Sequence, residues 1–177
     1  MNPNLEAKYI KLEKTRNRLL DELEAYTTEQ LNIIPVSGKW SIAQTIAHLV
    51  TVDQLTTDYM QRKVQQQEPL HKANLSHAFK ALLLKLALKS GKKFKAPPQV
   101  AAVPEFADLA ALRQQWDETR FKLEDILTDF PDENLSKCIF KHPYAGPLSV
   151  SQTLTFLQDH FDHHLPQIHQ LQHSLRS

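Results

Sequence analysis

Apolar residues recur at intervals of three and four along most of the chain, and this spacing constrains the fold more than any other feature of the sequence. It is typical of helices that bury one face. Near the N-terminus it predicts a first helix with the apolar stripe Leu5, Tyr9, Leu12, Leu19, Leu20, Leu23 and Tyr26. The 177 residues include only three glycines, which argues against a turn-rich sheet protein and against a Gly-rich phosphate loop. We therefore expect an all-α protein.

A short motif occurs twice in the sequence. Residues 38–45 read GKWSIAQT, and residues 146–153 read GPLSVSQT. In the first copy, Ser41 and Gln44 have the spacing of a capping box that opens a second helix. The apolar stripe of that helix is Ile42, Ile46, Leu49, Val52, Leu55 and Tyr59. The repeat predicts two similar helical hairpins, although chance convergence on capping signals is an alternative.

A bridging segment and two more helices complete the expected fold. A third, short helix is expected over residues 76–89, and the prolines of residues 91–107 predict a long loop after it. The fourth helix carries the stripe Leu109, Leu112, Trp116, Leu123 and Leu127. The fifth runs from Ser149 to about His173. The expected fold class is thus an all-α four-helix bundle with one additional short helix and a long Pro-containing loop, in a single domain over residues 1–177.

Charge and hydropathy exclude several classes of partner. Lysine plus arginine (21) nearly balances aspartate plus glutamate (20), so no basic field indicates a nucleic-acid partner. The apolar runs are far shorter than a membrane span. The basic segment 80–95 is interpreted as a bundle helix with a lysine face that leads into a loop, in preference to a membrane-surface helix. A single cysteine, Cys138, and the lack of a signal peptide favour the cytoplasm.

Histidine is the one residue type with an unusual distribution: of the nine histidines, four fall between positions 160 and 169. Helical periodicity places His160 and His164 on the inward face of the fifth helix. Their i,i+4 spacing brings the Cβ atoms within about 5–6 Å, so both imidazoles can bind one ion. His48, at the edge of the stripe of the second helix, can join them if the two helices pack together. The histidines expected to face solvent are His163, His169 and His173.

Other interpretations of these polar residues remain open at this point. A histidine on a helix face is more often structural or solvated than a ligand, and an i,i+4 pair arises easily in a His-rich stretch. Asp53 and Asp159 lie near the three histidines in sequence but are expected to be solvated, so no general base is visible. His142 is either a loop histidine or one that borders a pocket. Cys138 has no neighbouring charges that mark it as reactive.

Two segments resemble the DinB/YfiT-like superfamily of bacterial four-helix-bundle proteins, which is distinct from the DNA polymerase of that name. They are residues 38–50 and 142–168, and the resemblance covers most of the chain. Its most specific parts are Trp40-Ser41 followed by His48, and the run His160-x-x-x-His164-x-x-Gln167. The resemblance implies a metal site formed by His48, His160 and His164. Pro166 departs from a regular helical motif, and a kink is expected there.

The expected chemistry follows from the ligand set. Three neutral imidazoles leave coordination positions open, as in catalytic sites, and zinc and nickel both suit imidazole. The resemblance implies thiol-dependent chemistry, because characterised members of the superfamily include transferases and isomerases that use thiols such as bacillithiol or mycothiol. Our first hypothesis is a metal-dependent transferase or hydrolase that acts on a small molecule, with a low-molecular-weight thiol as cosubstrate. The alternative is a non-catalytic, stress-related protein in which the metal ties two helices together.

A homodimer is expected from the third helix. Its leucines cover more of the helix circumference than one inward stripe requires: Leu82, Leu83, Leu84, Leu86 and Leu88. Apolar patches of that extent are uncommon on monomers. Relatives in the resembled superfamily also commonly form homodimers. Cover by the 91–107 loop is the alternative.

Overall fold

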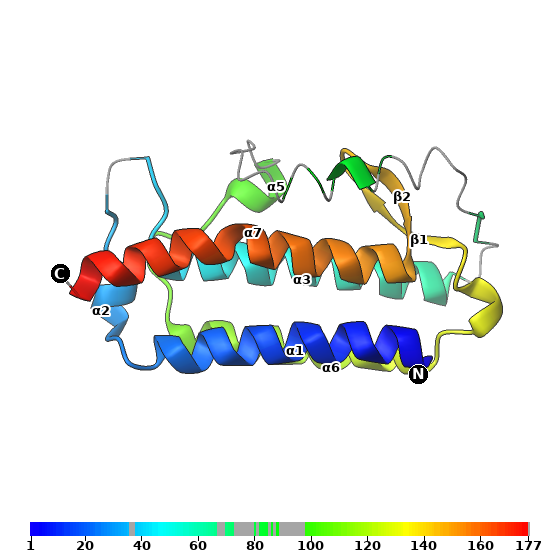
Figure 1. Ribbon diagram of the computed structural model, residues 1–177, viewed down its shortest axis with the longest axis horizontal. Coiled ribbons are helices and arrows are strands. Elements are labelled where there is room, and N and C mark those ends of the chain that lie inside the picture. The colour runs from blue at the N-terminus through cyan, green and yellow to red at the C-terminus, as the bar shows by residue number, and fades with distance from the viewer. Residues whose placement is uncertain are drawn as a thin grey trace.

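Four long helices form the body of the protein in a computed structural model that describes residues 1–35, 38–66, 70–72, 80, 82–84, 86, 88 and 98–176. They are α1 (Pro3–Leu23), α3 (Ile42–Gln65), α6 (Leu109–Thr128) and α7 (Val150–Arg176). Figure 1 shows them lying lengthwise beside one another as a bundle. The expectation of a mostly helical fold is confirmed. Among the described residues, no helix has the length and apolarity needed to cross a membrane.

The order of the helices around the bundle differs from their order in the sequence. The contacts of α1 are with α7 and α6, and those of α3 are with α6 and α7. In Figure 1, α1 and α7 run in one direction while α3 and α6 run in the other. The two long helices of each predicted hairpin, α1 with α3 and α6 with α7, therefore lie diagonally across the bundle. The prediction of two packed hairpins is wrong. The parallel neighbours α3 and α6 therefore both begin at the same end of the bundle (Figure 1).

The repeated motif nevertheless has the same local structure in both copies. Gly38 and Gly146 both have a positive φ, 79° and 75°, which glycine adopts without strain. Ser41 and Ser149 each cap the following helix in a reciprocal capping box with the glutamine three residues later. In each copy the next threonine donates its hydroxyl to the serine carbonyl at 2.8 Å. The resemblance between the copies thus fixes how α3 and α7 start, not how they pack.

A small antiparallel hairpin precedes α7 and was not expected from the sequence. Strand β1 (Cys138–His142) pairs with β2 (Gly146–Ser149), with Phe140 opposite Leu148. Strands this short give no usable alternation, although the run Cys-Ile-Phe contains the β-branched and aromatic residues that favour strands. The hairpin packs on α3 and α7. It therefore places the residues of its strands, including His142 at the end of β1, beside these two helices.

The shorter elements lie in the connections. They are α2 (Thr28–Leu31), α5 (Pro98–Ala101) and the 3-10 turn η1 (Asp132–Asn134). The α5 helix corrects the expectation that 91–107 contains no regular helix: Pro98 stands in the first turn, where its missing N–H costs no hydrogen bond. Residues 91–97 lie outside the described residues. So does most of the third helix expected over 76–89, of which residues 80, 82–84, 86 and 88 are described and helical.

The bundle interior holds apolar residues together with buried charges. Both hydrophobic clusters draw on all four long helices: one also includes the hairpin and lies toward the N-terminal end of α1, and the other lies toward the C-terminal end of α1. The stripe expected on α3 is buried except at Leu55, which is 45% exposed, and Tyr59, which is half-buried. Asp53, expected in solvent, takes an inward position instead and is only 5% exposed. Its partners are Arg120, which forms an ion pair with it, and Trp116, whose indole N–H donates to the same carboxylate oxygen.

Candidate metal centre

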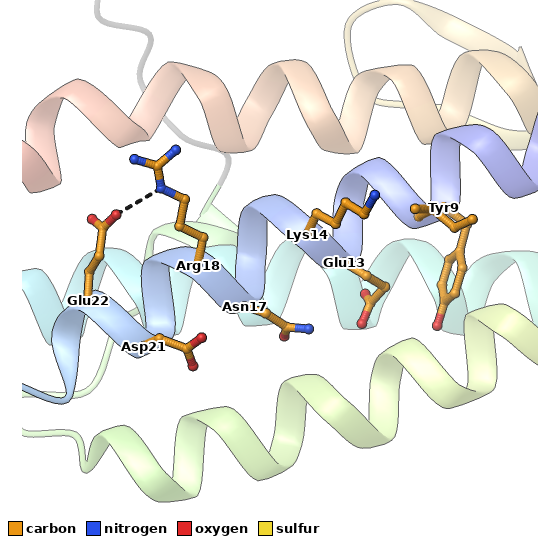
Figure 2. Close-up of a pocket in the computed structure, with 8 residues that line it drawn as sticks. Tyr9, Glu13, Lys14, Asn17, Arg18, Asp21 and Glu22 are labelled. Atoms are coloured by element: carbon orange, nitrogen blue, oxygen red, sulfur yellow. Dashed lines mark hydrogen bonds and ion pairs between the residues drawn. The ribbon is translucent and has the colours of Figure 1, made fainter.

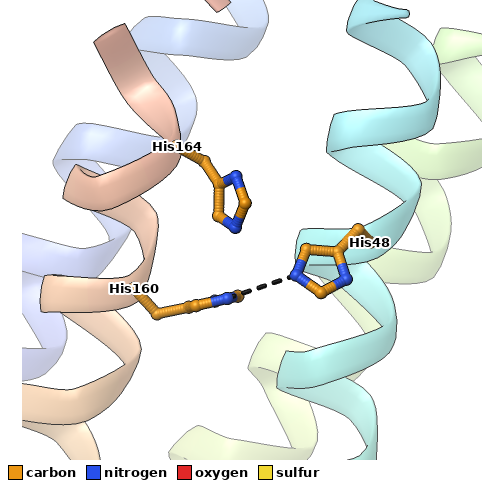
Figure 3. Close-up of side chains that lie close together, drawn as sticks. All are labelled: His48, His160 and His164. Atoms are coloured by element: carbon orange, nitrogen blue, oxygen red, sulfur yellow. Dashed lines mark hydrogen bonds between the residues drawn. The ribbon is translucent and has the colours of Figure 1, made fainter. Parts of the chain in front are cut away.

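Three histidines converge between two neighbouring helices of the bundle, α3 and α7. His48 comes from α3, and His160 and His164 come from successive turns of α7 (Figure 3). One ring nitrogen from each lies within 4.8 Å of the others. The Nε2 atoms of His48 and His160 are 3.2 Å apart. These are the three residues expected to form a metal site, and the structure brings them together.

The convergence depends on the packing of α3 against α7. The i,i+4 spacing places His160 and His164 on one face of α7, with ring centroids 4.8 Å apart. The His48 ring lies 5.1 Å from the first and 5.0 Å from the second. The helix continues through Pro166 to Arg176, so the proline does not end it beside the histidines.

Hydrogen bonds orient two of the three rings. Nδ1 of His48 lies 2.7 Å from the carbonyl oxygen of Val100, which can only accept, so Nδ1 carries the proton and Nε2 is bare. Nδ1 of His164 lies 3.4 Å from Oε1 of Gln167, whose amide in turn donates to Thr45 on α3. Such outer hydrogen bonds fix the tautomer and direction of metal-binding histidines. They leave Nε2 of both rings available for an ion.

The spacing of these nitrogens fits a divalent ion of the zinc type. Metal–nitrogen bonds of about 2.0–2.1 Å in tetrahedral geometry separate the ligand nitrogens by about 3.3 Å. The 3.2 Å between Nε2 of His48 and Nε2 of His160 matches that value, and no pair in the cluster exceeds 4.8 Å. The donor set is neutral and holds no thiolate, which suits an ion that keeps open positions.

Burial keeps the cluster neutral. It holds the pKa of His160 well below the ordinary value of 6.5, and the neighbouring histidines lower it further. Burial also lowers the pKa of His164 to about 4 and that of His142 to about 4, and it lowers the pKa of His48. Metal binding needs unprotonated imidazole. These histidines are therefore in the binding form at neutral pH without first losing a proton.

Lowering the pH from 7 to 4 is expected to destabilise the metal-free protein. His142 titrates near 4 in the folded state and near its ordinary value of 6.5 when unfolded. Between these values the unfolded chain binds more protons, so falling pH favours unfolding. For His142, which is only 7% exposed, the loss is about 3 kcal/mol at pH 4. Urea unfolding at several pH values measures it. The variant His142→Phe should show a shallower pH dependence, and an unchanged dependence would contradict the assignment.

The remaining histidines divide differently from the sequence expectation. His169 and His173 are exposed, as expected. His163 is not: it is half-buried, and its Nδ1 lies 2.8 Å from the carbonyl oxygen of Leu88. Because His163 lies three residues after His160 on α7, its ring is turned toward Leu88. Asp159 is also buried, at 7% exposure, where a solvated carboxylate was expected.

Three neighbours of the cluster contribute in ways that the sequence does not single out. The Trp40 ring packs on His48 at 4.9 Å, and the Phe156 ring lies 5.7 Å from His160. Phe156 stands one turn before His160 on α7, so helical spacing could have identified it. Val100 contributes a backbone carbonyl, which any residue could supply. No residue-type pattern could have identified it.

A separate depression of about 700 Å³ lies along α1 (Figure 2). It is lined by Tyr9, Ile10, Glu13, Lys14, Asn17, Arg18, Asp21 and Glu22. Both acidic and basic side chains line it, and Arg18 and Glu22 form an ion pair at 3.0 Å. Because both signs of charge are present, the depression favours neither an anionic nor a cationic ligand. The depression contains none of the three clustered histidines and is not part of the candidate metal centre.

The fold and the cluster together define a class: four-helix-bundle proteins with a three-histidine cluster between two neighbouring helices. The chain belongs to the DinB superfamily, whose family model matches residues 11–168. It is also 23% identical over 155 residues to YuaE, an uncharacterised protein of Bacillus subtilis (strain 168), covering 88% of this chain and 91% of that protein. No solved structure gives a significant match. The family and the histidine cluster fit a metal-binding protein of this superfamily.

Proposed function

We propose that His48, His160 and His164 hold one divalent metal ion and that the protein is a metal-dependent transferase or hydrolase acting on a small molecule, with a low-molecular-weight thiol as cosubstrate. The observation that carries the proposal is the convergence of three neutral imidazoles, with all ligand atoms within 4.8 Å. Zinc and nickel are the ions that this donor set suits best in a cell. We also propose that residues 1–177 act as one domain in the cytoplasm.

A metal ion held by three imidazoles supplies Lewis acidity: it lowers the pKa of a bound water or holds a thiol as thiolate. The chain supplies the orientation of the ligands. Val100 and Gln167 fix the rings of His48 and His164 before the ion arrives. The Trp40 ring lies 4.9 Å from the His48 ring, tilted by 44°, and adds apolar surface beside the site. His160 and His164 are both half-buried, so a small molecule can approach the cluster from the α7 side.

The alternative function is a non-catalytic one, in which the ion joins α3 to α7. It is favoured by the burial of His48, which is only 3% exposed and covered by the carbonyl of Val100. In that case no open coordination position is used, and the ion contributes stability alone. A ligand that enters the metal's coordination sphere distinguishes the two functions.

Binding of a thiol to the cobalt-loaded protein tests the enzymatic proposal. Protein purified without an affinity tag is loaded with Co²⁺ and titrated with 2-mercaptoethanol. A thiolate that enters an open position produces a sulfur-to-cobalt charge-transfer absorption band, which we expect to saturate with one thiol per cobalt. The variant His160→Ala is the control and should produce no band. A cobalt spectrum that does not respond to thiol would favour the non-catalytic function.

We further propose a homodimer. Leu82, Leu83 and Leu86 are 52%, 48% and 56% exposed, whereas Leu88 is 8% exposed. Three exposed leucines within five residues form an apolar surface of the kind that a second subunit covers, and a two-fold dimer is the commonest arrangement. Light scattering should then give about twice the chain mass of 20.4 kDa. The variant Leu82→Glu/Leu86→Glu should shift the mass to that of a monomer, and a wild-type monomer would contradict the proposal.

A further inference from the structure

His142 is a fourth buried imidazole near the cluster, and the hairpin fixes its protonation. It ends strand β1 and is 7% exposed. Its Nδ1 faces the backbone N–H groups of Tyr144 and Ala145, at 3.2 and 3.1 Å. Both groups can only donate, so Nδ1 must accept and cannot carry a proton. The neutral ring therefore has its proton on Nε2, and Nε2 can only donate.

This tautomer excludes His142 as a general base. Nδ1 is occupied by two donors, and Nε2 already carries a hydrogen. Protonating the ring would place an N–H group against two others, and burial lowers the pKa of His142 to about 4 in any case. At neutral pH the residue is a permanent, uncharged hydrogen-bond donor. An uncharged donor is compatible with a nearby cation, whereas an imidazolium would repel it.

The location of His142 relates it to the histidine cluster. Its ring packs edge-on against Phe156 at 4.6 Å, and Phe156 lies 5.7 Å from His160. One phenyl ring is therefore in contact with both imidazoles. His142 is also among the groups whose charge would lower the pKa of His160. Because Nδ1 is turned to the hairpin's own backbone, Nε2 lies on the other edge of the ring, away from the turn.

We propose that Nε2–H of His142 donates a hydrogen bond to an anionic ligand bound by the metal that His48, His160 and His164 hold. This inference rests on the proposed function. The ligands it selects are small anions with a free lone pair, such as a carboxylate or a thiolate. The hairpin thus contributes a specificity-determining residue to a site whose metal ligands come from the two helices.

Azide binding to the cobalt-loaded protein tests the proposal. Azide replaces a solvent ligand on cobalt, changes its visible spectrum, and keeps a terminal nitrogen that accepts a hydrogen bond. We expect His142→Phe, which keeps a ring against Phe156, to weaken azide about tenfold, as expected for one hydrogen bond to an anion. His142→Gln, which retains an N–H donor, should recover part of the affinity. His169→Ala removes an exposed histidine and should change nothing.

Two results would overturn this role for His142, and a third would overturn the site itself. Equal azide affinity in wild type and His142→Phe, with cobalt bound in both, rules out the hydrogen bond. An unchanged Nε2–H NMR signal of His142 when azide is added to the wild-type zinc protein also rules it out. This measurement needs no variant, so it remains valid if His142→Phe does not fold. A wild-type chain that binds neither cobalt nor zinc overturns the metal site and, with it, the role of His142.

Discussion

The variant His160→Ala is expected to lose stoichiometric metal binding, with a dissociation constant for zinc at least about 100-fold weaker than in wild type. Loss of an outer hydrogen-bond partner alone typically costs 10–100-fold in affinity, and a direct ligand contributes more. His160 is adjacent to both other ligands: its Nε2 is 3.2 Å from that of His48, and its ring is 4.8 Å from His164. Competition with a chromogenic chelator measures the constants.

The same series contains its own controls. His48→Ala and His164→Ala should weaken zinc to a similar extent, because each leaves two imidazoles. His169→Ala removes an exposed histidine of the same helix and should bind zinc as wild type does. Val100 contributes only a backbone carbonyl, so Val100→Ala should keep the hydrogen bond to His48 and the affinity. If His160→Ala binds zinc as tightly as wild type does, the ion is bound elsewhere and the three-histidine site is disproved.

The variant Arg120→Ala is expected to lower the free energy of unfolding by about 3–5 kcal/mol. Arg120 is 2% exposed and pairs with Asp53, which is 5% exposed. Removing the arginine leaves a buried carboxylate without its counter-charge, while the hydrogen bond from the indole N–H of Trp116 remains. The neighbouring Glu13, whose pKa burial already raises, also loses one of its two cationic partners: its carboxylate lies 3.7 Å from Arg120 and keeps its ion pair with Arg16 at 2.8 Å. Urea denaturation measures the loss.

A matched control lies two residues further along α6. Lys122 pairs with Asp58 at 2.9 Å, but their side chains are 39% and 30% exposed. Lys122→Ala should cost less than about 1 kcal/mol, because solvent screens the pair. The double variant Asp53→Leu/Arg120→Met, which removes both charges, should recover much of the stability lost in Arg120→Ala. Equal losses in Arg120→Ala and Lys122→Ala would contradict the assignment of a buried ion pair.

The helices themselves could be predicted from local signals. The apolar spacing of α1 and α6 and the capping boxes at Ser41 and Ser149 lie within the segments they describe, so no distant contact is needed to recognise them. The i,i+4 spacing likewise predicted that His160 and His164 share a face. The hairpin escaped prediction because its strands of five and four residues are too short for a periodic pattern.

The errors at Asp53, at His163 and in the pairing of the helices have a common cause. Asp53 was expected in solvent because a carboxylate without a visible partner is normally exposed, and its partner Arg120 lies 67 positions away in the sequence. His163 was expected in solvent because its partner, the carbonyl of Leu88, belongs to a segment 75 positions away. The two predicted hairpins failed because similar local starts do not specify which helices become neighbours. Each error concerns a contact between residues far apart in the chain.

Four long helices, the capping boxes of α3 and α7, the shared face of His160 and His164 and the superfamily could all be read from the amino-acid sequence. These depend on interactions over a few residues or on motifs within one segment. Helix packing was needed to show that α3 lies antiparallel to α7 and brings His48 to the pair, that Val100 fixes the tautomer of His48, and that the hairpin adds His142. The physical reason is that side-chain periodicity specifies which face of a helix is buried but not which other helix covers it.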